Sequence, residues 1–395
     1  MLRKRFFSIV TALLMTFMAS GCSLLSILSS SSSSEESSLE EKEMLVDYIV
    51  EVEEGRDPVV LQLTDTQIID ASQQRTEDRL GGALASYWAK DKKEERCYRY
   101  LRQIIGRSNP DLIILTGDIV YGEFDDDGSA LSEFVQFMES FNIPWAPIFG
   151  NHENESKMGV DWQCEQFENA KNCLFKRREL TGNGNYTVGI KQGERLLRVF
   201  YMLDSNGCGS PSIESSATQR IRTASGFGTD QIEWYENSMA RLKEESPNTR
   251  ISMAFHIPIE AFITAFTEKY DYNALEFTPI DLDKVGVDGD FGYIGVKFSG
   301  WDKSYTVWKT ALKYGVDSMF VGHDHAISAG VKYGNIHLQF GQKSTTYDSL
   351  NYINSQGKIE SSYSEIGKPI VGGTVIPVSK LDGTISPYNM LYIEE

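Results

Sequence analysis

The stretch Ser318-Met319-Phe320-Val321-Gly322-His323-Asp324-His325 joins a short, mostly apolar run to two histidines that are two residues apart. An apolar run of this length, ended by glycine, is typical of a buried β-strand. The histidines follow its carboxyl end, which is where ligands bind in α/β sheets. In an extended turn, two such imidazoles can reach two metal ions from one side. The stretch therefore predicts a strand end that carries metal ligands.

Four further apolar runs end in the same way, each just before a polar motif. Val59–Leu63 precedes Asp65-Thr66-Gln67, Leu112–Leu115 precedes Gly117-Asp118, Trp145–Phe149 precedes Gly150-Asn151-His152-Glu153, and Ile251–Phe255 precedes His256. Between these runs, apolar residues at three- and four-residue steps predict helices over 94–107, 130–141, 229–244 and 304–314. This alternation predicts an α/β fold with two sheets.

The motifs combine the ligand types that a dinuclear metal centre needs, because carboxylate and amide oxygens are hard donors and imidazole nitrogens are borderline ones. Each motif alone has an ordinary structural explanation. An aspartate after a strand is often a helix cap, and His337, which lies in a strand-like run, is best explained as a core residue. Four of the five histidines fall in the motifs, however, and the set as a whole predicts a metal site for phosphoryl chemistry.

In type and order, the set resembles the calcineurin-like metallophosphoesterases, whose motifs run Asp-x-His, Gly-Asp, Gly-Asn-His-Asp/Glu, His and Gly-His-x-His. The resemblance covers residues 59–325. It implies a four-layer α-β-β-α sandwich of two mixed sheets with two metal ions between the sheets. It also implies the roles of six ligands: Asp118 bridges the metals, Asp65 and His325 bind the first, and Asn151, His256 and His323 bind the second.

One position departs from the family pattern, because Gln67 stands where the first motif usually has histidine. The purple acid phosphatase branch also lacks this histidine and uses the tyrosine of Gly-Asp-x-x-Tyr as a ligand, which matches Tyr121. A phenolate is a hard anion, so this resemblance implies Fe³⁺ at the first site and Fe²⁺, Zn²⁺ or Mn²⁺ at the second. In the alternative, Gln67 binds the metal weakly and Tyr121 only packs against its neighbours.

The implied activity is hydrolysis of a small phosphate ester by a hydroxide that bridges the metals. His152 follows the ligand Asn151 and faces the same pocket, so we expect it to be the general acid. Glu153 or Asp324 would orient His152 or the ligand histidines, with a buried ion pair or a cap as the alternative. Monoesters are the favoured substrates. A phosphodiesterase with the same centre and a non-catalytic, metal-containing surface binding protein stay open as alternatives.

Two features bear on location and partners. Arg3, Lys4 and Arg5 precede an apolar run, so we expect residues 1–21 to be a secretory signal. The ending Ala19-Ser20-Gly21-Cys22 resembles a bacterial lipobox, with Ala19 where leucine is usual. It implies lipidation of Cys22 and anchoring at the cell surface or the periplasm-facing membrane, with simple cleavage as the alternative.

We expect residues 22–54, which are rich in Ser and Glu, to be a flexible tether and residues 55–395 to be the catalytic domain. The net charge of -18 excludes a non-specific nucleic-acid binder. Four cysteines remain, Cys97, Cys164, Cys173 and Cys208. Export permits disulfides, and Cys164 with Cys173 is the favoured pair, with free buried thiols as the alternative. The sequence leaves the oligomeric state open.

Overall fold

The computed structural model describes residues 45–70, 72–73, 93–207, 226–299, 305–346, 348–363 and 365–394. They belong to a compact unit that spans residues 44–395. The predicted signal, Cys22, most of the predicted tether and Cys208 lie outside the described residues. No helix in the described ranges has the length and apolar content that a membrane crossing needs.

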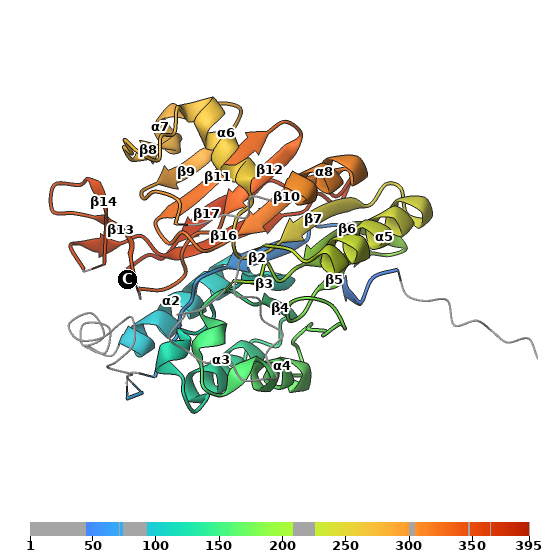
Figure 1. Cartoon of the computed structure of the whole chain (residues 1–395), viewed down its shortest axis with the longest axis horizontal. Coiled ribbons are helices and arrows are strands. Elements are labelled where there is room, and N and C mark those ends of the chain that lie inside the picture. Colours follow the sequence, from blue (N-terminus) through green and yellow to red (C-terminus); the bar gives the residue numbers. More distant parts are fainter. Residues whose placement is uncertain are drawn as a thin grey trace, which may run out of the picture. The chain divides into compact units, whose positions relative to one another are not determined.

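The smaller of the two main sheets is mixed and has the strand order β17-β16-β2-β3-β4. Its members are β2 (Val59–Leu63), β3 (Leu112–Thr116), β4 (Trp145–Ile148), β16 (Gly372–Pro377) and β17 (Tyr388–Leu391). β2, β3 and β4 are parallel, and all five residues of β3 are buried, as expected for a parallel strand covered on both faces. The helices α2 (Lys93–Ser108), α3 (Ser129–Glu139) and α4 (Gly159–Asn169) lie on the outer side of this sheet (Figure 1).

The larger sheet is also mixed and has the order β1-β5-β6-β7-β10-β12-β11-β9-β8. Its members are β1 (Tyr48–Glu51), β5 (Tyr186–Gln192), β6 (Arg195–Met202), β7 (Arg250–Ala254), β8 (Ile280–Asp281), β9 (Phe291–Ile294), β10 (Val316–Val321), β11 (Ile327–Tyr333) and β12 (Ile336–Phe340). The strands β6, β7, β10 and β12 are parallel neighbours. The helices α5 (Thr229–Glu245), α6 (Glu260–Tyr270) and α8 (Tyr305–Tyr314) cover its outer face (Figure 1). The predicted four-layer sandwich of two mixed sheets is therefore confirmed.

Smaller elements complete the unit. A three-stranded sheet contains β13 (Leu350–Ile353), β14 (Ile359–Ser362) and β15 (Lys368–Pro369). Single turns of helix occur at η1 (Gly122–Phe124), η2 (Glu153–Glu155) and α7 (Leu282–Val285). The four predicted helices match α2, α3, α5 and α8 to within two residues at each end.

The structure corrects two expectations. The predicted tether extends too far, because β1 pairs with β5 and Val46, Val50 and Val52 are buried, an alternation that favours a strand over a tether. The favoured disulfide was wrong as well. Cys164 and Cys173 are free and buried, and so is Cys97. Cys164 packs in the core from within α4, while Cys173 lies in a segment that pairs with Trp145.

Candidate metal centre

The five predicted strand ends meet at one edge of the sandwich. β2, β3 and β4 bring their motifs from the smaller sheet, and β7 and β10 bring theirs from the larger one. Backbone hydrogen bonds tie the loops together, from Asp65 N to Gly117 O (3.1 Å) and from Gly322 N to His256 O (3.1 Å). Because the carboxyl ends of parallel strands point the same way, residues far apart in sequence converge here.

The backbone at these strand ends is unusual. Asp65 and Asp118 both have a φ of 50°, and His323 has a φ of 78°. Residues other than glycine seldom adopt positive φ, and they do so mostly where function holds them there. The left-handed turn reverses the chain directly after each strand. The side chain that follows the strand therefore points toward the neighbouring loops instead of continuing the pleat.

Asp65 lies at the first end of the cluster, beside the Gly-His-Asp-His loop. Its Oδ1 is 3.3 Å from His325 Nε2, and its carboxylate accepts hydrogen bonds from the backbone N of His323 (3.2 Å) and from Thr64 Oγ1 (2.7 Å). Burial alone would raise the pKa of Asp65, but the hydrogen bond and charge of His325 together with the charge of His256 lower it to about 2. The carboxylate is therefore ionised and available to a cation.

Asp118 lies at the second end with His256, Asn151 and His323. His256 Nε2 is 3.2 Å from Asp118 Oδ2, and Asn151 Oδ1 is 2.9 Å from His323 Nδ1 and 3.2 Å from His256 Nε2. His256 Nδ1 donates to Thr116 O at 2.8 Å, so Nε2 is the nitrogen presented to the cluster. Burial alone would lower the pKa of His256, but the charge and hydrogen bond of Asp118, together with the charge of Asp65 and the hydrogen bond to Thr116 O, raise it to about 10.

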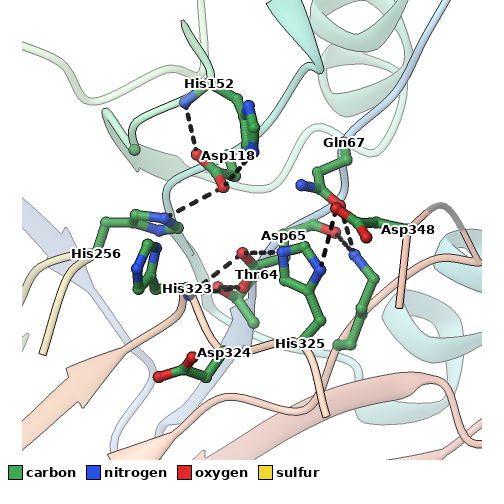
Figure 2. Close-up of polar contacts among 12 residues, drawn as sticks. Thr64, Asp65, Gln67, Asp118, His152, His256, His323, Asp324, His325 and Asp348 are labelled. Carbon is green, nitrogen blue, oxygen red and sulfur yellow. Dashed lines mark hydrogen bonds and ion pairs between the residues drawn. The ribbon is translucent and has the colours of Figure 1, made fainter. Parts of the chain in front are cut away.

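These side chains fit a metal ion. Ligand atoms of Asp65, Asp118 and His256 lie within 4.8 Å of one another, and all three residues are buried. Asp118 Oδ2 is buried without a hydrogen bond of normal geometry and faces His256 Nε2 at 3.2 Å, so both atoms are available to one cation. The donor set of carboxylate, amide oxygen and imidazole suits Fe, Zn or Mn. Figure 2 shows Asp65, Asp118, His256 and His325 turned toward one another.

Glycine at position 150 is needed for this arrangement. A Cβ at Gly150 would lie 2.2 Å from Asp118 Oδ1, closer than any real contact. The Gly-Asn-His-Glu motif can therefore approach the Gly-Asp motif only because its first residue has no side chain.

His152 stands beside the cluster and is held on both sides. Its backbone N donates to Asp118 Oδ1 (2.9 Å), and its Nδ1 lies 2.7 Å from Glu155 Oε2. The ring packs against that of Tyr121, with the ring centroids 4.0 Å apart and the planes tilted by 32°. A carboxylate beside Nδ1 places the proton there and leaves Nε2, which is 3.8 Å from Asp118 Oδ2, facing the cluster.

Glu153 and Asp324 were the carboxylates expected to orient His152 or the ligand histidines, and the one that contacts the His152 ring is another residue. Glu155, one turn further along η2, contacts the imidazole, while Glu153 accepts hydrogen bonds from Gly150 N (2.7 Å) and Ile119 N. Glu153 thus ties two ligand loops together, and burial followed by the charge of Asp118 raises its pKa to about 8. The i,i+3 spacing of His152 and Glu155 was visible in the sequence, but it is informative only once the short helix is known.

Asp324 contacts a neighbouring loop. Its Oδ1 accepts hydrogen bonds from Ser299 N (2.8 Å) and Ser299 Oγ (2.6 Å), so the residue anchors the segment that follows β9. Burial raises the pKa of Asp324 to about 6. Asp348, which the sequence did not single out, lies 3.7 Å from His325 Nδ1 through its Oδ2.

Lys343 was also missed. It is buried, and its Nζ donates to Asp65 O and to Gln67 Oε1, both at 2.8 Å. One weak signal for it is present in the sequence. Lys343 follows the end of β12, a parallel neighbour of β10, just as the predicted ligands follow their strands.

The cluster forms one wall of a cavity of about 520 Å³. Of the seven predicted metal ligands, Asp118, Tyr121, Asn151, His323 and His325 line this cavity, and Asp65 and His256 are buried behind them. His152, Asp324 and Asp348 also line it. The remaining lining residues are Val296, Lys297, Ser299, Ser349 and Tyr363. Phosphate-sized ligands therefore have access to the predicted centre.

The fold and site define a metallophosphoesterase, and the chain belongs to the Calcineurin-like phosphoesterase family, whose pattern matches residues 58–326. Among its relatives, the chain is 39% identical over 250 residues to "Probable inactive purple acid phosphatase 28" of Arabidopsis thaliana, a match that covers 58% of this chain and 56% of the relative. "Probable inactive purple acid phosphatase 29" of the same plant is 26% identical over 253 residues, 57% of each chain. "Phosphatase DCR2" of Saccharomyces cerevisiae is 25% identical over 250 residues, 59% of this chain and 39% of the relative.

The chain spans about half the length of the curated relatives it matches. Among solved structures, a dimetal phosphatase from Danio rerio aligns with a TM-score of 0.45 at 11% identity, over 86% of this chain and all of that one. The purple acid phosphatase PPD1 from yellow lupin aligns with a TM-score of 0.37 at 14% identity, over 84% of this chain and 53% of that one.

Proposed function

We propose that this chain hydrolyses phosphate monoesters with the help of two metal ions. One observation carries the proposal. Five strand ends from two sheets bring two carboxylates, an amide and three imidazoles into one cluster on a cavity, and Asp118 Oδ2 is buried there against His256 Nε2. Such a cluster of buried, charged groups is unfavourable unless cations compensate it.

Each metal would have its own ligands. Asp65, His325 and Tyr121 would hold the first ion, Asn151, His256 and His323 the second, and Asp118 both. When bound, the ions would supply Lewis acidity toward a phosphoryl oxygen and would lower the pKa of a water molecule. A phenolate from Tyr121 favours Fe³⁺ at the first position, with Fe²⁺, Zn²⁺ or Mn²⁺ at the second.

His152 would protonate the leaving alcohol. Its Nδ1 is paired with Glu155, so the proton for the leaving group is carried on Nε2, the nitrogen that faces the cavity side. Glu155 stabilises the imidazolium before transfer and holds the ring in place, the role that a buried carboxylate plays beside other catalytic histidines.

Two alternatives use the same centre. A phosphodiesterase would need the same metals and would differ only in how the cavity accommodates the second ester group of the substrate. A non-catalytic binding protein has some support from the relatives named as probable inactive phosphatases. The His152–Glu155 pair favours catalysis, because a site that only binds metal has no need of a proton donor.

Rates on a nitrophenyl phosphate monoester and on the bis-nitrophenyl diester test the proposal. The metal-loaded chain should hydrolyse the monoester faster, and Asp118→Asn should abolish both activities together with metal binding. A chain that binds two metals and hydrolyses neither ester would refute catalysis. A faster rate on the diester would favour the phosphodiesterase.

We also propose that the chain is exported and anchored through Cys22, on the sequence of its N-terminus alone. The wild-type chain, expressed in a bacterium, should fractionate with membranes. The Cys22→Ala variant cannot be lipidated at this position, so it should appear in the soluble fraction or keep its signal segment uncleaved. A wild-type chain found in the soluble fraction would refute the anchor.

A further inference from the structure

Gln67 occupies the one position where this chain departs from the family pattern, and its amide is held in a fixed orientation. The side chain is fully buried, and its Oε1 accepts a hydrogen bond of 2.8 Å from the ammonium of Lys343. The same ammonium donates to the backbone oxygen of Asp65, also at 2.8 Å. The lysine therefore links Gln67 to the loop that carries a predicted ligand of the first metal.

The ammonium determines which end of the amide faces the cluster. An ammonium can only donate, so the atom next to it must be the amide oxygen. A flipped amide would place two donors against each other, so the orientation follows from chemistry. The amide nitrogen is left as the free end. In Figure 2 this nitrogen, drawn in blue, points to the side of the cluster on which Asp118 lies.

Gln67 Nε2 is buried and donates no hydrogen bond. A buried donor without a partner destabilises the protein by about 1–3 kcal/mol. An amide nitrogen carries two hydrogens and no lone pair for a metal, so it cannot replace the missing histidine as a ligand. It requires an acceptor, and phosphoryl oxygens are the charged acceptors that a phosphate ester would bring to the cluster.

We propose that Gln67 binds a phosphoryl oxygen through its Nε2 and is not a metal ligand. Lys343 is the positioning residue that keeps the amide in this orientation. The inference rests on the proposed function, because it takes the bound anion to be a phosphate ester or its product, inorganic phosphate. The position that ligates a metal elsewhere in the family here supplies a hydrogen-bond donor to the substrate.

Two measurements that do not depend on turnover test this on the full chain. One is the number of metal ions per chain after gel filtration, measured by elemental analysis. The other is the Kd of inorganic phosphate for the metal-loaded protein, measured by calorimetry. A hydrogen bond to a charged group is worth about 1.5–3 kcal/mol, so Gln67→Ala should weaken phosphate binding at least about tenfold and leave the metal content unchanged.

Two further variants separate the roles. Gln67→Glu keeps an oxygen for Lys343 but presents an acceptor to the anion, so it should weaken phosphate binding more than Gln67→Ala does. Lys343→Met frees the amide to rotate and should weaken phosphate binding in the same direction. Gln342→Ala is the matched control, since this buried glutamine donates to Ile370 O instead of facing the cluster; it should leave the phosphate Kd unchanged.

Loss of a metal ion in Gln67→Ala, with metal retained in Gln67→Glu, would overturn the inference and make Gln67 a ligand. Unchanged phosphate affinity in Gln67→Ala would overturn it as well. A wild-type chain that binds metal and phosphate but hydrolyses no ester would refute the proposed function and leave this inference standing. A wild-type chain that binds no phosphate would refute both.

Discussion

The contact between Glu155 and His152 gives the sharpest test of the chemistry. Glu155 Oε2 lies 2.7 Å from His152 Nδ1, and the side chain of Glu155 is fully buried. Glu155→Gln keeps the shape and an oxygen acceptor but removes the charge that stabilises an imidazolium. A charged hydrogen bond contributes about 1.5–3 kcal/mol, and each 1.36 kcal/mol changes a rate about tenfold. The variant should therefore lower kcat about ten- to a hundredfold.

The assay compares two monoesters that differ in the basicity of their leaving groups. Nitrophenolate leaves without much help from an acid, whereas an alkoxide must be protonated. If His152 is the acid, Glu155→Gln and His152→Ala should slow an alkyl phosphate much more than nitrophenyl phosphate. The double variant should be no slower than His152→Ala alone, because Glu155 acts through the imidazole.

Two results would refute this reasoning. Equal losses on both esters would mean that the pair only supports the fold or binds the phosphate. Additive losses in the double variant would mean that Glu155 acts independently of His152. His337→Ala is the control, since His337 lies in β12 outside the cavity and its Nε2 is 3.0 Å from Gln339 Oε1; its rates should keep the wild-type ratio between the two esters.

Three further predictions follow from the geometry. Tyr121→Phe should abolish a visible phenolate-to-iron absorption band of the iron-loaded protein, and an iron-free, colourless and active wild type would contradict Tyr121 as a ligand. Gly150→Ala should lower metal content and reduce the free energy of unfolding by about 1–3 kcal/mol, because its Cβ would meet Asp118; Gly106→Ala, where the added Cβ meets open space, should do neither. Burial raises the pKa of Asp125 to about 6, so the folded chain binds this proton more tightly than the unfolded chain, and stability falls as pH rises from about 4 to 6. The Asp125→Asn variant cannot ionise at this position, so its free energy of unfolding should rise by up to about 3 kcal/mol relative to that of wild type over this pH range. Urea unfolding at different pH values measures this. Parallel plots of unfolding free energy against pH for the two proteins would contradict it.

Much of the fold followed from sequence because each buried parallel strand is a short apolar run that ends at a polar motif. The runs at Leu112–Leu115 and Ser318–Val321 are examples, and the matching strands β3 and β10 are buried. Strands at the sheet edge were harder to predict. β1 has one buried residue, Val50, between the exposed Ile49 and Glu51, so beside a Ser/Glu-rich segment it offers little apolar pattern from which to predict a strand.

The candidate site also has residues that the sequence predicts and residues that it does not. Its predicted ligands lie on the strand ends, where position in the sheet follows from strand order. Glu155 lies in the short helix η2 and Lys343 and Asp348 lie in loops, and their contacts depend on how these segments close over the cluster. Loop closure is set by tertiary packing, and no periodicity in the sequence reports it.

Several locally unfavourable features of the described chain lie at this site. Asp65, Gln67, Asp118 and His323 all have positive φ, and Asp118 Oδ2, Gln67 Nε2 and Asp324 Oδ2 are buried without a hydrogen bond. Each such feature opposes folding by about 1–3 kcal/mol, and a chain selected for stability alone would remove them. Two of these atoms are acceptors and one is a donor. The acceptor on Asp118 lies where cations would bind, and the donor on Gln67 is held by an ammonium, which suits an anion. The site therefore presents an acceptor to a cation and a donor to an anion, and a metal phosphate complex is the kind of ligand that satisfies both.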